Sequence, residues 1–150
     1  MREPYIGANY PARRILILGE SSYGIGDMGD GAYVVHWLDH PNFVEHPQCK
    51  DCARVGGPEY KRDPLNDRLT AMMIGKPGAT DAERRAAWSN IAFTNFMVRE
   101  LADRSEGERP TEREWEDAAR QLPAVLDRLN PELCCCSTIR PALSVASPLP

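Results

Sequence analysis

Apolar runs alternate with breaker residues along the chain, in a pattern that predicts alternating strands and helices. The clearest run is Ile15–Leu18, four branched apolar residues between Arg14 and Gly19. A continuous apolar run of this length, closed by a glycine, is typical of a strand buried on both faces, as in a parallel sheet. We therefore predict the first strand at Arg14–Leu18.

Two later segments have strand character. Ile91–Val98 is rich in β-branched and aromatic residues with little charge, and Glu132–Ser137 follows the last helical pattern. The resulting order is strand, helices, strand, helix, strand, which indicates an α/β fold. Because βαβ crossovers place successive strands side by side, we predict that Arg14–Leu18 and Ile91–Phe96 are parallel neighbours.

Helical spacing and capping signals place the helices between these strands. Thr80–Glu83 and Thr111–Glu114 each match a capping box, and each should begin a helix. Pro123 should kink the second of these helices or restart it, because proline removes a backbone donor. The predicted helices are Tyr33–Leu38, residues 64–74, residues 80–88 and a helix from Thr111 that ends at Asn130. Residues 1–12 are expected to be an irregular lead-in, 41–62 a long loop and 138–150 an irregular tail.

Length, composition and net charge limit the classes of protein to which the chain can belong. The chain has 150 residues, enough for one domain, and its formal net charge of −4 lacks the basic excess that usually accompanies phosphate binding. No apolar window approaches the length of a membrane span, and the start of the chain lacks the apolar core of a signal peptide. We therefore expect a cytoplasmic protein with no membrane partner, whose cysteines are thiols or ligands.

The turn after the first predicted strand is the first candidate site. Ligands of open α/β sheets bind at the carboxyl ends of the strands, where the loops leave the sheet. The polar residues at this end are Glu20, Ser21, Ser22 and Tyr23, directly after Gly19.

Two familiar motifs fit this region poorly. The nucleophile elbow of esterases needs Gly-x-Ser-x-Gly, and Tyr23 stands where the last glycine should be. Gly24–Gly29 formally matches a dinucleotide fingerprint, but five residues separate it from Leu18, whereas the fingerprint should follow its strand directly. We interpret this glycine-rich segment as a flexible loop.

The cysteines suggest metal chemistry without completing a ligand set. Cys49 and Cys52 form a CxxC pair with His40 and His46 upstream, which is half of a zinc or iron–sulfur site. Because the remaining ligands are missing, we expect no stoichiometric zinc or iron and no cofactor. Cys134–Cys136 are consecutive, so neighbours would point to opposite faces of a strand. The favoured interpretation is small buried residues.

The ordered layout resembles the uracil-DNA glycosylase-like superfamily over residues 13–137. The resemblance is carried by the Gly19–Tyr23 turn, the strand with Asn95, and the helix that runs from Arg109-Pro110-Thr111 to Asn130-Pro131-Glu132. It is closest to an uncharacterised bacterial branch with a Gly-Glu-Ser-x-Tyr first motif. The resemblance implies a three-layer α/β/α domain with a central parallel sheet, spanning residues 1–150 and incomplete at its C-terminus.

The first motif matches two branches of that superfamily in part. One branch reads Gly-Gln-Asp-Pro-Tyr-His, which Gly19 and Tyr23 match, and another reads Gly-Glu-Ala-Pro-Gly, which Gly19 and Glu20 match. The water-activating aspartate of the first branch falls on Ser21, so Glu20 is the carboxylate left for that role. Tyr23 resembles the tyrosine that excludes the thymine methyl group, and Asn95 resembles the asparagine that reads the base edge.

The resemblance implies a DNA-repair hydrolase that excises uracil or a related base from single- or double-stranded DNA. A carboxylate can orient water and stabilise cationic sugar character as the base leaves. The implied catalytic residues are Glu20 and Asn95, the implied substrate-binding residues are Gly19, Ser21, Ser22, Tyr23 and Phe96, and no metal is implied.

Superfamily members carry a late His-Pro-Ser motif, whereas this chain has no histidine after His46. The three cysteines at 134–136 also replace a Val/Leu-rich run. We therefore expect a sequence that is truncated or shifted in frame near residue 134, with weak or absent catalysis. The alternative is a non-catalytic glycosylase-like binding module or a non-productive fragment.

Overall fold

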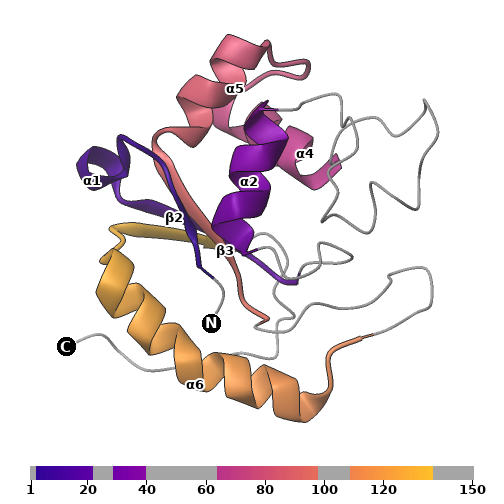
Figure 1. Ribbon diagram of the computed structural model, residues 1–150, viewed down its shortest axis with the longest axis vertical. Helices are drawn as coiled ribbons and strands as arrows, with labels where there is room; N and C mark the ends of the chain where they lie inside the picture. Colours follow the sequence, from indigo (N-terminus) through magenta and orange to yellow (C-terminus); the bar gives the residue numbers. More distant parts are fainter. Residues whose placement is uncertain (1–2, 22–28, 40–63, 98–108, 137–150) are drawn as a thin grey trace.

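The computed structural model describes residues 3–21, 29–39, 64–97 and 109–136 (Figure 1). These residues form a mixed α/β structure in which a four-stranded sheet lies among helices. The elements in chain order are β1 (Tyr5–Ile6), α1 (Tyr10–Arg13), β2 (Ile15–Gly19), α2 (Asp30–Asp39), α4 (Pro64–Ile74), α5 (Asp81–Trp88), β3 (Ile91–Asn95), α6 (Glu112–Leu129) and β4 (Leu133–Cys136).

The sheet is mostly parallel and has the strand order β1-β3-β2-β4. β2 pairs in parallel with β3, which places Ile17 opposite Phe93 and Gly19 opposite Asn95. β4 also runs parallel to β2, whereas β1 pairs with β3 in the antiparallel direction. The prediction that the first and second apolar segments are parallel neighbours is therefore confirmed.

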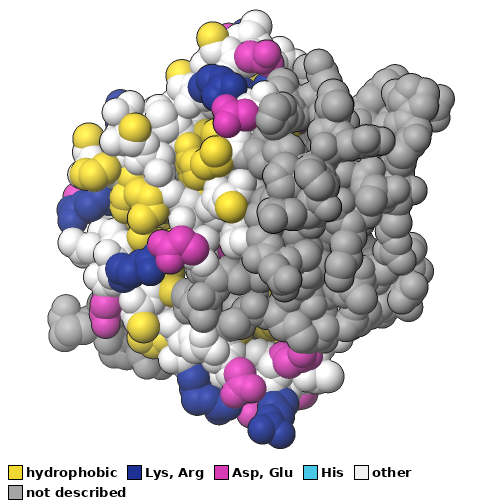
Figure 2. All heavy atoms as spheres, in the orientation of Figure 1, with side chains coloured by type: hydrophobic (Ala, Val, Ile, Leu, Met, Phe, Trp, Pro, Cys, Tyr) yellow, Lys and Arg dark blue, Asp and Glu magenta, His cyan; other side chains and the backbone are white. Residues whose placement is uncertain are grey.

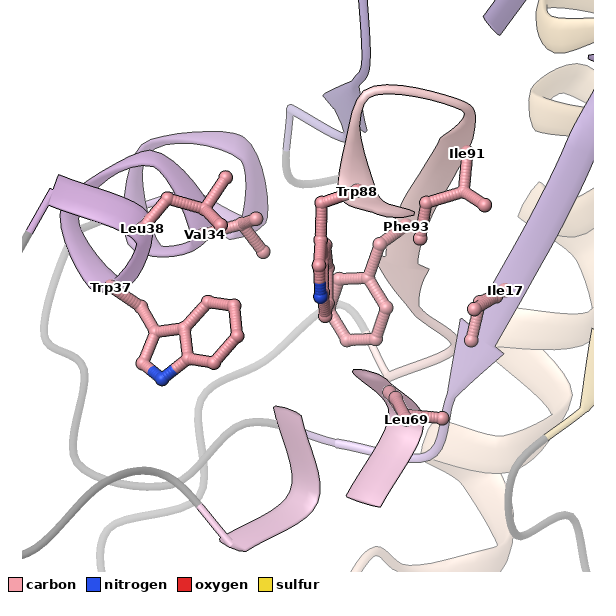
Figure 3. Close-up of a cluster of buried hydrophobic side chains, with 8 residues drawn as sticks. All are labelled: Ile17, Val34, Trp37, Leu38, Leu69, Trp88, Ile91 and Phe93. Carbon is pink, nitrogen blue, oxygen red and sulfur yellow. The ribbon is translucent and has the colours of Figure 1, made fainter. Parts of the chain in front are cut away.

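One face of the sheet packs on α2, α4 and α5 around the indole of Trp88 (Figure 3). The Trp88 ring lies 5.3 Å from the Trp37 ring and 5.8 Å from the Phe93 ring, measured between centroids. Its Nε1 donates a 2.8 Å hydrogen bond to Oγ1 of Thr70 on α4. Trp88 therefore joins three helices to β3, and its one polar atom has a partner.

The opposite face of the sheet packs on α6. Side chains alternate between faces along a strand, so Leu16 and Leu18 point away from the Trp88 cluster. Leu16 is buried against Val125 and Leu129, and Leu18 lies in a cluster that includes Ala118. Helices thus cover both faces, which explains why β2 is a continuous apolar run rather than an alternating one.

The helix starts agree with the sequence in three cases and differ in one. α4 begins at Pro64, as predicted. Both capping boxes are present, at Thr80 and at Thr111. α2, however, begins at Asp30, three residues before the predicted start at Tyr33. α6 continues through Pro123 as one helix and does not restart there, because buried residues on both sides hold it against the sheet.

Two predictions about the ends of the described sheet are wrong. The expected lead-in contains β1 and α1, because Tyr5 and Ile6 pair with β3 and become a strand through that pairing. The cysteines of Cys134–Cys136 are exposed rather than buried. β4 is the last strand in the described sheet order, so it has a strand neighbour on one side only.

None of the described helices combines the length and the apolar composition that crossing a bilayer requires.

We predict that Thr111→Ala lowers the free energy of unfolding by about 1 kcal/mol, the usual cost of losing an N-cap side chain. The Thr111 hydroxyl accepts from the backbone N–H of Glu114, and the Glu114 carboxylate accepts from the Thr111 N–H at 2.8 Å. Urea unfolding measures the change. Thr111→Ser keeps the hydroxyl and should retain most of the stability; an equal loss in both variants would contradict the capping role.

Candidate functional site

β2 and β3 end side by side, and their pairing continues beyond the last strand residues. Gly19 lies opposite Asn95 at the carboxyl end of both strands. Past this pair, the N–H of Phe96 donates to the Gly19 carbonyl at 2.8 Å, and the N–H of Met97 donates to the Glu20 carbonyl at 2.9 Å. The chain segments that leave the two strands are thereby held together at one edge of the sheet.

Asp30, the first residue of α2, is bound into this edge. Its carboxylate is 1% exposed and accepts from Thr94 Oγ1 at 3.0 Å, from the Asn95 backbone N–H at 2.7 Å and from Asn95 Nδ2 at 2.9 Å. Three donors satisfy a charge that would otherwise be costly to bury. This network joins the start of a helix to the end of a central strand.

Asp30 also decides which way the Asn95 amide points. A carboxylate only accepts hydrogen bonds, so the NH₂ group of Asn95 must be the end that faces Asp30. The carbonyl oxygen Oδ1 is then directed elsewhere, and it is buried with no hydrogen-bond partner among the described residues. It lies over Gly19, since a Cβ added there would come within 2.4 Å of Oδ1.

This arrangement leaves Oδ1 of Asn95 as a buried acceptor without a partner among the described residues. An unpaired buried carbonyl costs on the order of 1–3 kcal/mol, which a donor on a bound molecule would recover. Gly19 keeps the space above its α-carbon open to the Asn95 oxygen. Asn95 Oδ1 is therefore a fixed hydrogen-bond acceptor that an N–H or O–H group could satisfy.

The predicted site residues divide into three groups. Gly19 and Asn95 lie opposite each other, and Glu20 and Ser21, both partly exposed, follow at the same edge. Phe96 is 3% exposed and its ring lies 5.4 Å from that of Trp115 on α6, so it belongs to the core rather than to this site. The remaining predictions concern residues outside the described ranges: Ser22, Tyr23, Cys49, Cys52, His40 and His46.

Sequence reasoning missed Asp30 and Thr94. A usable signal was present for Asp30, because an acidic residue directly before a helical pattern favours the first helical turn. Thr94 lay inside a strand pattern with nothing to single it out. Their contact joins residues 64 positions apart, a pairing that no local pattern predicts.

No metal cluster of the usual size is found in the described part of the chain. Within these residues, no group of three or more His, Cys, Asp or Glu side chains is arranged to hold an ion. The site at the ends of β2 and β3 is therefore an arrangement of one amide, one buried carboxylate and the Glu20 turn.

Comparisons with family models, with curated proteins and with solved structures give no match for this chain. Its function must be inferred from the chemistry of its own residues.

We predict that Gly19→Ala lowers the free energy of unfolding by about 1–3 kcal/mol, as for other overpacked positions. The added methyl group would meet Asn95 Oδ1 at 2.4 Å and force either the amide or β2 to move. Gly29→Ala is the matched control, because a Cβ there meets nothing closer than 3.5 Å. Thermal unfolding of both variants measures the effect. Equal stabilities would show that Oδ1 does not occupy the space over Gly19.

We predict that Asp30→Asn destabilises the protein by about 1–3 kcal/mol, because an amide in this place turns an NH₂ group toward donors that need an acceptor. Asp39→Asn makes the same chemical change at the exposed end of α2, where Asp39 pairs with Arg85 at 2.9 Å. Exposed pairs contribute about 0–1 kcal/mol, so this control should change little. Urea unfolding compares the two, and similar losses would contradict the Asp30 network.

Proposed function

We propose that the edge formed by Gly19, Glu20 and Asn95 binds a uracil-like nucleobase, and that the chain is a three-layer glycosylase-like domain acting on DNA. The observation that carries this proposal is the buried, unpartnered Oδ1 of Asn95 beside a glycine. A fixed acceptor suits a flat ring that presents an N–H group.

The orientation of the Asn95 amide favours uracil over cytosine. Uracil carries an N–H at ring position 3, where cytosine carries a bare nitrogen acceptor. An oxygen that faces the uracil N–H would form a hydrogen bond, whereas facing the cytosine nitrogen it would meet a second acceptor. Sites built to hydrogen-bond a donor reject analogues that lack it, because the buried polar group is then left unpaired.

Glu20 is the residue that we assign to chemistry. A carboxylate at the edge of the site can orient water toward the sugar and stabilise positive charge as the N-glycosidic bond breaks. The base must first leave the stack, which single-stranded DNA makes easier. The chain has no histidine after His46 to stabilise the departing base, and losing such a donor costs about a hundredfold or more in rate. We therefore expect slow hydrolysis.

The charge of the chain supports a second candidate, a binding module without catalysis. The formal net charge is −4, and on the face shown in Figure 2 the Lys and Arg side chains lie beside acidic ones. Pairs of this kind include Lys76 with Glu83 at 2.6 Å and Arg128 with Glu3 at 3.0 Å. Cations that are already paired add little affinity for phosphates, so a free base or nucleoside would then be the ligand.

We predict that uracil binds to the wild-type chain and that Asn95→Ala weakens binding by about tenfold or more, the worth of one good hydrogen bond in a buried site. Asn90→Ala is the matched control, because the Asn90 amide donates to the Ala86 carbonyl before β3 begins. Titration calorimetry with uracil and with cytosine measures both affinities. Absence of uracil binding, or equal binding by Asn95→Ala, would contradict the proposal.

Uracil release from single-stranded DNA separates the two candidates. Glu20→Gln should abolish release while uracil still binds through Asn95, if Glu20 acts on water. Uracil binding without release by any variant would support the binding module and exclude the hydrolase.

A further inference from the structure

Arg84 on α5 is a buried cation whose hydrogen bonding is incomplete. Its side chain is 1% exposed. The guanidinium nitrogen Nη1 donates to Asp81 at 2.7 Å, but the Asp81 side chain is mostly in water. The other two nitrogens, Nε and Nη2, are buried with no hydrogen-bond partner among the described residues. Burying a charge is costly unless it is paired and hydrogen-bonded, so this guanidinium lacks an acceptor.

The two unpaired nitrogens of Arg84 form one edge of the guanidinium group. The N–H bonds of Nε and Nη2 point the same way in the guanidinium plane, and such a pair fits the two oxygens of a carboxylate. Asp81 accepts from Nη1 and leaves this edge unused. The missing hydrogen bonds are therefore arranged as a fork for one bidentate partner.

The ring of Trp37 on α2 lies against this guanidinium. Cζ of Arg84 is 5.2 Å from the centroid of the ring, which is the distance of a cation–π contact. Trp37 is itself fully buried, and its Nε1 is another donor without a partner among the described residues. Trp88, four residues after Arg84 on the same face of α5, packs on the other side of this group, with its ring centroid 5.3 Å from that of Trp37 (Figure 3). These aromatic surroundings supply donors and no acceptor.

We propose that the Nε–Nη2 edge of Arg84 binds the carboxylate of a small organic acid. Two parallel, charge-assisted hydrogen bonds would satisfy both nitrogens at once. One carboxylate charge matches the one charge of Arg84, of which the exposed Asp81 neutralises little. A phosphate dianion would bring an excess charge among buried aromatic rings.

This site is separate from the edge formed by Gly19, Glu20 and Asn95. Trp37 lies about 10 Å along α2 from Asp30, the residue that contacts that edge. Because Arg84 is buried, the ligand enters only when α5 opens locally, a motion that native proteins undergo without unfolding. α5 has 8 residues and is the shortest of the three helices on this face of the sheet. Binding should therefore be slow, and the enclosed charge pair should be screened little by salt.

The test titrates sodium acetate into the full chain at constant ionic strength and follows the Nε–H signal of Arg84 by heteronuclear NMR, assigned through its own backbone. We expect a saturable downfield shift of this signal. The melting temperature should rise as well, since a ligand that binds only the folded state stabilises it.

Two variants locate the acetate site. Arg84→Lys keeps the positive charge but lacks the fork, so it should weaken acetate binding about tenfold or more, the worth of one charge-assisted hydrogen bond. Arg85→Lys is the matched control, because Arg85 is the exposed neighbour that pairs with Asp39. This control should keep the affinity of the wild-type chain.

Sodium phosphate at the same ionic strength tests the class of ligand. Phosphate binding as strong as acetate binding would overturn the assignment to a carboxylate. An Nε–H signal that does not move with acetate would overturn the site, and it is measured on the wild-type chain even if Arg84→Lys fails to fold. Equal acetate affinity in Arg84→Lys and the wild-type chain would place the ligand elsewhere and overturn the proposal too.

Discussion

The buried carboxylate of Asp30 holds the start of α2 against the end of β3, and the geometry of the candidate site depends on it. Without this acceptor, the Thr94 hydroxyl, the Asn95 N–H and the Asn95 amide would each lose a buried partner. Because β3 is fixed to β2 by the pairing of Asn95 with Gly19, the same network also sets what lies above Gly19. The Asp30 side chain thus links the position of α2, the end of β3 and the orientation of the Asn95 amide.

Short-range sequence patterns predicted the strands and helices that depend on interactions between residues close in sequence. The apolar run of β2, the β-branched run of β3 and both capping boxes are short-range patterns, and each was found where expected. β1 could not be read in this way, because Tyr5 and Ile6 form a strand only through their partner β3. The exposure of Cys134–Cys136 follows from a place at the end of the strand order, which the pattern within the strand does not encode.

Only part of the candidate site could be predicted, because some of its residues follow from local patterns and others from contacts between distant residues. The rule that ligands bind at the carboxyl ends of parallel strands selected the turn that follows Gly19, and the resemblance selected Asn95, which the register places opposite Gly19. It could not select Asp30, whose role arises from contacts with residues 64 and 65 positions away. The resemblance also included Phe96, although the residue after a strand end can turn inward, as this one does toward Trp115.

The net charge of the chain and the orientation of the Asn95 amide indicate which contacts would supply the binding energy of the proposed site. In an acidic chain where described cations such as Lys76 and Arg128 are already paired, those cations gain little from phosphates, so the base edge would have to supply most of the binding energy. An acceptor oriented before binding requires no reorganisation when the ligand arrives, which is the condition under which one hydrogen bond discriminates well. Under the proposal, hydrolysis would depend on Glu20 alone, while recognition would depend on Asn95 and on the Asp30 carboxylate that holds its amide. The proposed recognition and the proposed catalysis would therefore be separable, and the first would not require the second.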